Sequence, residues 1–442
     1  MSGTDLESML VQPNAFLPAA RYTSPEFLEL ELEHLFGKVW QMAGREEQIP
    51  APGDFLEYQI GDESVIIVRS ESGGLDAFPN VCLHRGTQLA HGCGHFDGNS
   101  IRCPYHSWTY SIDGTLRFVP DREEFPDLPD DLALQHVQVD SWGGFIFVNL
   151  DRDAKPLLEM LEPLPTLLAA YHLEELKFRS YLSTVIHANW KTVVDAFNEA
   201  YHVQGLHQQI LAWTDDVAIA YEQFPLGHAH YGQIGAARGI LRPSPRLGLD
   251  PSEYDEGELL FSRVNALGGA FMGAERDAVQ ALRDEGPPEG QTLLEAYQHY
   301  RLGVLNGRGF DTSGLEPAQM TSVEDTFVFP NVVGPLFPGT ALMFRVRPNG
   351  HDPNSCLKDT WVLEWPDPGS DWKMPKIRDY PNWHDRDWGE VTEQDYNNLG
   401  NVQAGMRSKA CEGLRLNPRQ EGNVLRMHEV VDEYITKGLA NS

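Results

Sequence analysis

Short runs of alternating apolar and polar residues, separated by turn residues, dominate the chain between residues 40 and 150. Residues 54–60 and 64–68 have this alternation and are rich in β-branched and aromatic side chains. An Asp-Gly pair at 113–114 is typical of a hairpin turn, and residues 142–148 form a last apolar run. Such closely spaced strands with turns between them predict a small all-β domain.

The residues before this region favour a helix instead. The sequence Thr23-Ser-Pro25-Glu26 can cap a helix and place proline in its first turn, and apolar residues then continue to Trp40. We therefore predict a helical lead-in that packs on the larger, C-terminal part of the chain.

Beyond residue 153 the pattern mixes strands with helices. Several neighbouring strands after a long helix predict an antiparallel sheet wrapped around that helix, with an apolar cavity between them. The expected strands are residues 181–186, 326–331, 340–347 and 358–365, and the expected helices are residues 293–305, a segment from 392 and a segment near 420–434. Possible pocket residues, which could equally be core, are Phe327, Phe329, Phe337, Met343 and Phe344.

Three segments follow from these patterns. Residues 1–44 are the helical lead-in, residues 45–152 the all-β domain, and residues 153–442 the domain with the antiparallel sheet. The predicted fold class is α+β. His228 and His230 alternate as on a strand of the last segment, which favours pocket or surface positions over metal ligation.

Composition limits the possible functions. The net charge of −31 argues against nucleic acid or anionic membrane as a partner, although it would suit a basic electron-donor protein. The sequence has no apolar run of eighteen residues and no signal-peptide pattern at its start, so we expect a cytoplasmic protein. Five cysteines at irregular spacing do not indicate a disulfide framework.

Two Cys-plus-His pairs are the most informative motif. They are Cys82-Leu-His84 and Cys103-Pro-Tyr-His106, with eighteen residues between His84 and the second cysteine. Two thiolates and two imidazoles can bind a two-iron, two-sulfide cluster. Zinc is the alternative, but structural zinc sites rarely alternate cysteine and histidine in this order.

A third group of potential ligands lies between the two pairs. His91, Cys93 and His95 alternate with glycines, and this composition alone could bind a metal. Because the flanking pairs already supply four ligands, we interpret this group as part of a flexible connecting loop.

The first motif closely resembles the Rieske motif of ring-hydroxylating oxygenases. In that family an Arg-Gly pair follows the first histidine, as at Arg85, and the second loop reads Pro-Tyr-His-x-Trp, as it does up to Trp108. The resemblance implies a Rieske domain. It also implies that one iron is bound by Cys82 and Cys103, and the other by His84 and His106.

A second motif follows the expected strand 181–186. In a helix, Asp195, Glu199 and His202 would share one face, because steps of four and three residues are neighbours on a helix. His207 would lie about 140° around an undistorted helix from His202. The helix must therefore open near Gly205 if both imidazoles are to bind one metal. The alternative is an ordinary pair of surface or core histidines.

This segment is similar to the mononuclear-iron motif of the same family, in which an asparagine corresponding to Asn189 begins the helix. The resemblance implies that His202 and His207 are iron ligands. It also implies that Glu199 links the two metal centres across a subunit boundary, although that position is most often Asp in the family. Asp195 is the competing candidate for this role.

The third iron ligand is expected near the C-terminus. Residues from Thr392 onwards resemble the family segment in which an Asp near a helix start binds iron and a Gln about two turns later packs nearby. Asp395 corresponds to this ligand, and Glu393 is the second choice. The alternative is a carboxylate that binds no metal and only interacts favourably with the helix dipole.

The resemblance implies the terminal oxygenase component of a Rieske oxygenase with a helix-grip catalytic domain. Electrons from a ferredoxin or an NAD(P)H-dependent reductase would pass through the cluster to the mononuclear Fe(II), where O2 hydroxylates an aromatic or other bulky apolar substrate. A homotrimer is expected, with a possible β subunit. Alternatives are oxidative demethylation of an amine or ether, an electron carrier without chemistry of its own, and a binding protein.

Overall fold

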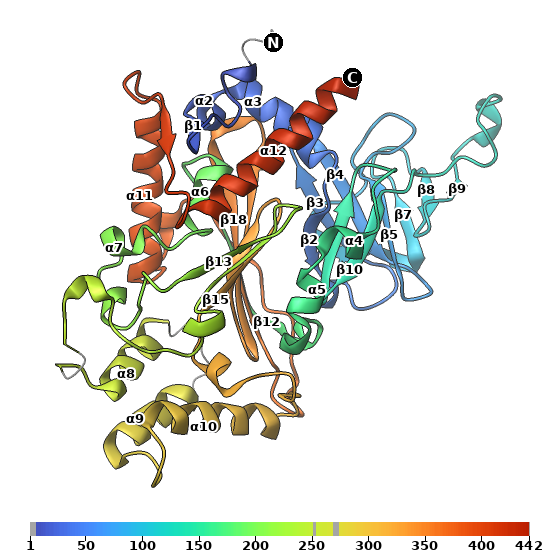
Figure 1. Ribbon diagram of the computed structural model, residues 1–442. Helices are drawn as coiled ribbons and strands as arrows, with labels where there is room; N and C mark the ends of the chain where they lie inside the picture. Colours follow the sequence, from blue (N-terminus) through green and yellow to red (C-terminus); the bar gives the residue numbers. More distant parts are fainter. Residues whose placement is uncertain (1–5, 251–252, 268–273, 442) are drawn as a thin grey trace. The chain divides into compact units, whose positions relative to one another are not determined.

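The computed structural model describes residues 6–250, 253–267 and 274–441, which group into two compact units (Figure 1). One unit comprises Met1–Glu29 and Pro163–Thr436, and the other comprises Leu30–Glu162 and Lys437–Ser442. The expected lead-in 1–44 is therefore divided between the two units, with the division inside helix α3 (Pro25–Leu30). The boundaries at residues 44 and 152 stay predictions.

The smaller unit is built from β-sheets, which confirms the predicted all-β domain. Its four-stranded sheet has the order β5-β4-β3-β6 and its two three-stranded sheets the orders β10-β11-β2 and β7-β8-β9. The strands are β2 (Gln41–Arg45), β3 (Asp54–Ile60), β4 (Glu63–Arg69), β5 (Leu75–Pro79), β6 (Cys93–His95), β7 (Ser100–Arg102), β8 (Thr109–Ser111), β9 (Leu116–Phe118), β10 (Gln138–Trp142) and β11 (Phe145–Asn149).

A hydrophobic core lies beneath the two loops that carry the Cys-plus-His pairs. Ile66, Phe78 and Tyr110 are fully buried in it, together with the two cysteines. The predicted hairpin between β8 and β9 turns at Gly114, whose φ of +86° favours glycine. A Cβ atom there would also lie 2.6 Å from the Phe78 ring, so this turn closes directly on the core.

The larger unit contains an eight-stranded sheet of order β13-β14-β15-β16-β17-β18-β12-β19. All neighbouring strands are antiparallel except β12 and β19, so the predicted antiparallel sheet is confirmed. Its strands are β12 (Lys177–Ile186), β13 (Ala220–Gln223), β14 (Ala229–Gly232), β15 (Glu324–Val328), β16 (Val332–Phe337), β17 (Thr340–Asn349), β18 (Asp352–Glu364) and β19 (Arg378–Tyr380).

Two groups of helices in the larger unit matter for the site and its surroundings (Figure 1). Helix α6 (Trp190–Ala196) packs against β17 and β18 and against α11 (Glu390–Met406). Helices α8 (Glu256–Ala266), α9 (Ala274–Glu285) and α10 (Leu293–Gly307) pack on one another. A short strand β1 (Phe16–Pro18) pairs with β20 (Gly413–Arg415), and helix α12 (Gly422–Asn441) ends the chain.

Candidate metal centres

Helix α6 is shorter than expected, because it ends at Ala196 instead of continuing to residue 207. The chain then turns, and only Val203–Leu206 form a second helix, α7. Asn189 caps α6 by accepting a hydrogen bond from the Lys191 amide, and its own amide donates to Gln403 Oε1 of α11. The turn between α6 and α7, and not a widening near Gly205, brings the two histidines together.

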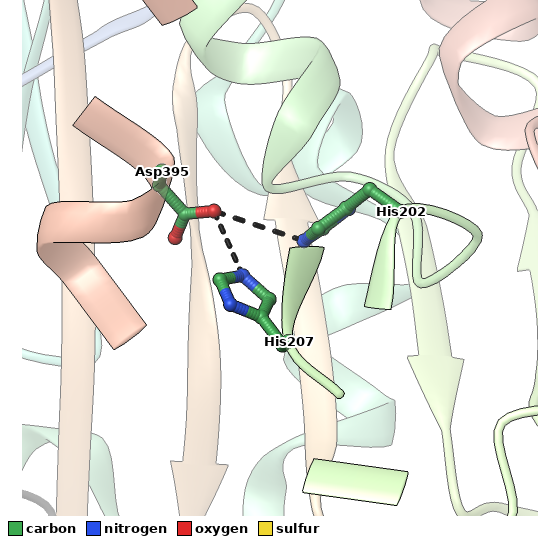
Figure 2. A group of neighbouring side chains, drawn as sticks. All are labelled: His202, His207 and Asp395. Atoms are coloured by element: carbon green, nitrogen blue, oxygen red, sulfur yellow. Dashed lines mark hydrogen bonds and ion pairs between the residues drawn. The ribbon is translucent and has the colours of Figure 1, made fainter. Parts of the chain in front are cut away.

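His202, His207 and Asp395 form a triad at this point (Figure 2). One potential ligand atom from each side chain lies within 4.8 Å of the other two. Nε2 of His207 is 2.8 Å and Nε2 of His202 is 3.9 Å from Oδ1 of Asp395. His207 and Asp395 are buried, whereas His202 is partly exposed. Two imidazoles and one carboxylate on one side of a site suit non-haem iron with open positions.

Hydrogen bonds at the far side of each ring fix which nitrogen faces the triad. His202 Nδ1 lies 2.5 Å from Glu199 Oε1, and His207 Nδ1 lies 2.7 Å from Gln394 Oε1. Both oxygens can only accept, so each Nδ1 carries a proton, and Nε2 is the ring nitrogen left to bind a metal. This arrangement orients both Nε2 atoms for a metal.

Asp395, and not Glu393, reaches the triad from the first turns of α11. The Glu393 carboxylate instead accepts a hydrogen bond from the Trp388 amide at 3.2 Å, just before the helix. The Gln expected two turns later is Gln403, which accepts hydrogen bonds from the Asn189 amide and from Thr192 Oγ1. This glutamine therefore joins α11 to the start of α6.

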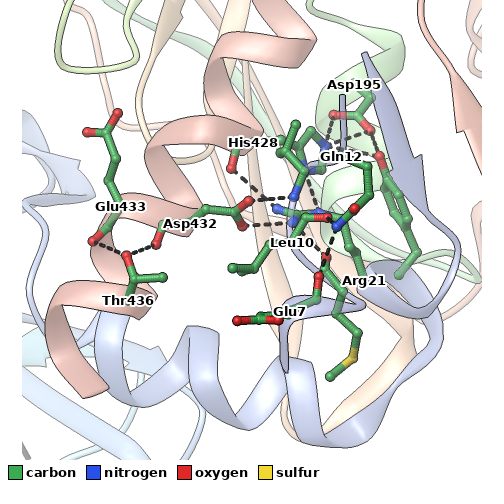
Figure 3. Close-up of polar contacts among 12 residues, drawn as sticks. Glu7, Leu10, Gln12, Arg21, Asp195, His428, Asp432, Glu433 and Thr436 are labelled. Carbon is green, nitrogen blue, oxygen red and sulfur yellow. Dashed lines mark hydrogen bonds and ion pairs between the residues drawn. The ribbon is translucent and has the colours of Figure 1, made fainter. Parts of the chain in front are cut away.

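Asp195 belongs to a separate buried network (Figure 3). Its carboxylate accepts a hydrogen bond from Tyr22 Oη at 2.7 Å and lies 3.1 Å from His428 Nε2. Arg21 donates to His428 Nδ1 and pairs with Asp432 at 2.7 Å. Burial lowers the pKa of His428, although Asp195 acts in the opposite direction. Asp195 therefore ties the end of α6 to residues near both ends of the chain.

A pocket of about 180 Å³ opens beside the triad. Its lining includes Asp195, Glu199, His202 and Asp395, together with Glu421 from the segment before α12. Burial raises the pKa of the Glu421 carboxyl, and the charges of Glu199 and Asp195 raise it further. The pocket is therefore negatively charged, and it lies on the side of His202 that contacts Glu199.

The two Cys-plus-His pairs also meet. The rings of His84 and His106 lie 4.7 Å apart, and Trp108 stacks on His84 at 4.9 Å. Among the described residues, neither buried Nδ1 atom of these histidines has a hydrogen-bond partner. Both cysteines are buried and not in disulfides. Two buried thiols and two unpaired imidazole nitrogens are the donor set that a Rieske cluster requires.

Tyr110 supports the first of these loops from the core. Its hydroxyl lies 3.5 Å from Cys82 Sγ and accepts a hydrogen bond from the Leu83 amide. Burial raises the pKa of the Cys82 thiol, while the hydrogen bond from Tyr110 lowers it. A hydrogen bond to a cluster-binding sulfur is one means by which proteins tune cluster potential.

The interpretation of His91, Cys93 and His95 as part of a flexible loop is wrong in one respect. Cys93 and His95 belong to strand β6, which pairs with β3. Their side chains do not converge: Cys93 is exposed, His91 lies 4.0 Å from Glu57 and His95 lies 2.9 Å from Asp54. Both imidazoles therefore face carboxylates on β3.

The histidines on β14 and in its preceding turn are structural. His228 Nδ1 accepts a hydrogen bond from the Phe329 amide, and His230 Nε2 lies 3.5 Å from Glu324. Both are buried, so neither has the surface position that was one of the two expectations. The aromatic residues proposed as pocket or core, Phe327 among them, are also buried.

Comparison with known families identifies the class of protein. The Rieske [2Fe-2S] domain family matches residues 39–135, and the family of the ring-hydroxylating alpha subunit (catalytic domain) matches residues 173–256 and 271–437. The chain therefore belongs to the alpha subunits of Rieske-type ring-hydroxylating oxygenases. It is an oxidoreductase that incorporates O2, with a Rieske [2Fe-2S] cluster and a catalytic domain with a two-histidine, one-carboxylate candidate iron site.

Several relatives are more specific. The chain is 38% identical over 409 residues to the glycine betaine monooxygenase oxygenase subunit of Chromohalobacter salexigens, which covers 90% of this chain and 80% of that protein. It is 34% identical over 231 residues to the carnitine monooxygenase oxygenase subunit of Escherichia coli K12, covering 52% and 60% of the two chains. It is 35% identical over 210 residues to the salicylate 5-hydroxylase large oxygenase component of a Ralstonia species, covering 43% and 48%.

Solved structures share the fold. The apo form of the quaternary ammonium Rieske monooxygenase CntA superposes with a TM-score of 0.65 at 18% identity, covering 97% of this chain and 98% of that one. Naphthalene 1,2-dioxygenase from Rhodococcus bound to indole gives 0.65 at 21% identity, covering 99% and 98%. Within the described part of the chain, the helices are too short or too polar to span a membrane.

Proposed function

We propose that this chain is the oxygenase component of a monooxygenase that removes an N-methyl group from a quaternary ammonium compound. The observation that carries the proposal is the 38% identity with a glycine betaine monooxygenase subunit over 90% of this chain. Glu199 at the bridging position agrees with it, because glutamate there occurs in branches of the family that act on quaternary amines. The demethylation alternative is thus better supported than hydroxylation of an aromatic ring.

The atoms and charges of the proposed reaction balance. One N-methyl group, O2, two electrons and two protons give an N-hydroxymethyl group and one water. The N-hydroxymethyl ammonium then loses formaldehyde and a proton to leave a tertiary amine. The two electrons come from a reductase, which the oxygenase subunits of this class require as a partner.

The chain's own residues would hold the two metal sites. His202, His207 and Asp395 would bind one iron, which supplies the activation of dioxygen when bound. Glu199 and Gln394 hold the Nδ1 protons of the two histidines and so keep both Nε2 atoms directed at that iron. Cys82, Cys103, His84 and His106 would bind the cluster.

Electron transfer to the iron is proposed to cross a subunit boundary in a homotrimer. Glu199 has the geometry for the bridging role, because one carboxylate oxygen lies on His202 Nδ1 while the side chain also lines the pocket beside the triad. A histidine of a neighbouring subunit's cluster site could bind the other side of this carboxylate. Asp195 is less suited, because its carboxylate binds Tyr22 and His428 and not a candidate iron ligand.

A substrate panel tests the reaction. Purified protein with both metal centres loaded and a reductase present should release one formaldehyde per O2 consumed with glycine betaine or carnitine. His202→Ala should abolish both signals. Salicylate and naphthalene serve as comparison substrates, because relatives of both types share sequence or fold with this chain. Ring hydroxylation of these compounds, without formaldehyde from any ammonium compound, would contradict the proposal.

A further inference from the structure

The sheet of the larger unit presents one unpaired acid toward the segment that leads to His202. Asp325 on β15 lies directly opposite Tyr231 on β14, so the two side chains share one face of the sheet. Tyr231 Oη donates a hydrogen bond to the Phe197 carbonyl, just beyond the end of α6. Asp325 therefore lies on the face of the sheet that packs against the segment just before His202.

Two stacked tyrosine rings accompany Asp325 on this face. Tyr221 on β13 pairs with Tyr231, and their ring centroids lie 5.6 Å apart with the planes 6° from parallel. The Tyr221 hydroxyl accepts a hydrogen bond from the Ala200 amide at 3.2 Å. Both rings are thus fixed at their hydroxyl ends to residues 197–200, and the carboxylate of Asp325 raises the pKa of both phenols after burial.

Asp325 differs sharply from the acid next to it. Glu324 binds Tyr171 at 2.9 Å, Arg238 at 2.9 Å and His230 at 3.5 Å. The side chain of Asp325 has no hydrogen bond or ion pair with any residue that the structure describes, and burial alone raises the pKa of its carboxyl to about 7. A carboxylate in this setting costs free energy unless a positive charge joins it.

We propose that Asp325 receives the positive charge of the substrate, with Tyr221 and Tyr231 as the aromatic wall beside it. This inference rests on the proposed function. A quaternary ammonium group has no N–H donor, so proteins recognise it by a negative charge and by aromatic rings instead of hydrogen bonds. An unpaired carboxylate on a residue that is only partly buried, beside two fixed rings, suits such a group.

The test compares two ligands that differ by one atom. Glycine betaine and its carbon isostere, in which a tert-butyl group replaces the trimethylammonium group, have the same shape but differ in charge. Their dissociation constants are measured by calorimetry on the full-length, iron-loaded protein without oxygen. The unmodified protein should prefer glycine betaine by at least about tenfold. Asp325→Asn should lose most of this preference while binding the isostere and iron as before.

Glu222→Gln is the matched control. Glu222 lies on β13 next to Tyr221, but its side chain points to the other face and is exposed. This variant also removes one negative charge, but on the opposite face of the sheet. It should therefore keep the preference for glycine betaine. Melting temperatures of both variants show that they are folded.

The outcomes separate the two proposals, because the binding assay needs no turnover. Equal preference in Asp325→Asn and in the unmodified protein would overturn the role of Asp325, and formaldehyde release would still support the function. Loss of preference only in Asp325→Asn would support this role, even if the unmodified protein released no formaldehyde and the proposed reaction failed. Equal affinity of the unmodified protein for the two ligands would also overturn the proposed role of Asp325.

Discussion

Glu199 Oε1 and His202 Nδ1 lie 2.5 Å apart, three residues from each other in a turn and not in a helix. The second oxygen of Glu199 accepts hydrogen bonds from the backbone amides of Tyr201 and His202. The carboxylate is therefore fixed by its own chain before it orients the imidazole. One side chain thus sets both the tautomer and the direction of a predicted iron ligand.

Glu199→Ala should lose nearly all turnover even when iron is added until both metal sites are fully loaded. The variant removes the acceptor that orients His202 and the carboxylate proposed to bridge the centres, and we expect a loss of about 100-fold or more. Turnover with iron and sulfide analysis measures this. Glu421→Gln is the control, because Glu421 lines the same pocket but binds the Asn417 amide. Normal coupled turnover in Glu199→Ala would remove this residue from the electron path.

Gln394→Leu should weaken iron binding without affecting the cluster. The variant deletes the acceptor 2.7 Å from His207 Nδ1, and loss of such a partner costs about 10- to 100-fold in metal affinity. Competition with a chelator gives the dissociation constant, and the cluster spectrum reports the other site. Gln394→Glu restores an acceptor and should bind iron nearly as well as the unmodified protein. Equal loss in both variants would mean that Gln394 acts by packing alone.

His428 should make the protein less stable in acid. Because its pKa is lower in the folded protein than the ordinary value near 6.5, the unfolded chain binds more protons as pH falls through that value. Stability is then lost toward lower pH, with a slope of up to about 1.4 kcal/mol per pH unit from this group. Thermal melts between pH 5 and 8 measure it. His428→Gln should flatten this part of the curve, and an unchanged slope would contradict the assignment.

Asp325→Asn should stabilise the protein above neutral pH. The carboxyl has a pKa of about 7 when folded and an ordinary value near 3.8, so the folded protein binds more protons between these values and loses stability as pH rises through them. Asparagine removes that cost, and we expect a gain of up to about 4 kcal/mol at pH 8 without ligand. Denaturant titration measures it. A loss of stability at pH 8 would mean that Asp325 is a structural residue.

Cys93→Ser should leave the absorbance of the cluster intact, whereas Cys103→Ser should remove it. Cys93 is exposed on β6, and Cys103 is buried beside Cys82. Optical spectra and sulfide analysis compare the two variants. Bleaching by Cys93→Ser to the same extent as by Cys103→Ser would overturn the assignment of the cluster ligands.

The sequence allowed the strands and the ligand motifs to be predicted where their signals are local. Residues 54–60 alternate in hydrophobicity, and the structure forms β3 over these residues. The histidines near residue 205 stand close enough together to be noticed. Partners that lie far apart in the sequence could not be found: Tyr22 and Asp195 are 173 residues apart, and His207 and Gln394 are 187 apart.

The end of α6 and the role of Asp325 were missed for different reasons. Spacing alone favoured a helix through His202. The turn at 197–200 instead forms hydrogen bonds with the hydroxyls of Tyr221 and Tyr231, which only the folded sheet brings there. The strand pattern placed residues 326–331 near β15, yet alternation does not reveal the register that sets Asp325 opposite Tyr231.

The spacing of the two sets of ligand candidates along the chain sets an order for biosynthesis. The last residue of the cluster motif is Trp108, and the small β unit is nearly complete by Glu162. The iron triad needs Asp395, and the network that anchors α6 needs His428. A growing chain can therefore present a finished cluster site while its iron site still lacks a carboxylate. The complete iron site therefore forms only after almost the entire chain has been made, whereas the cluster site is complete earlier.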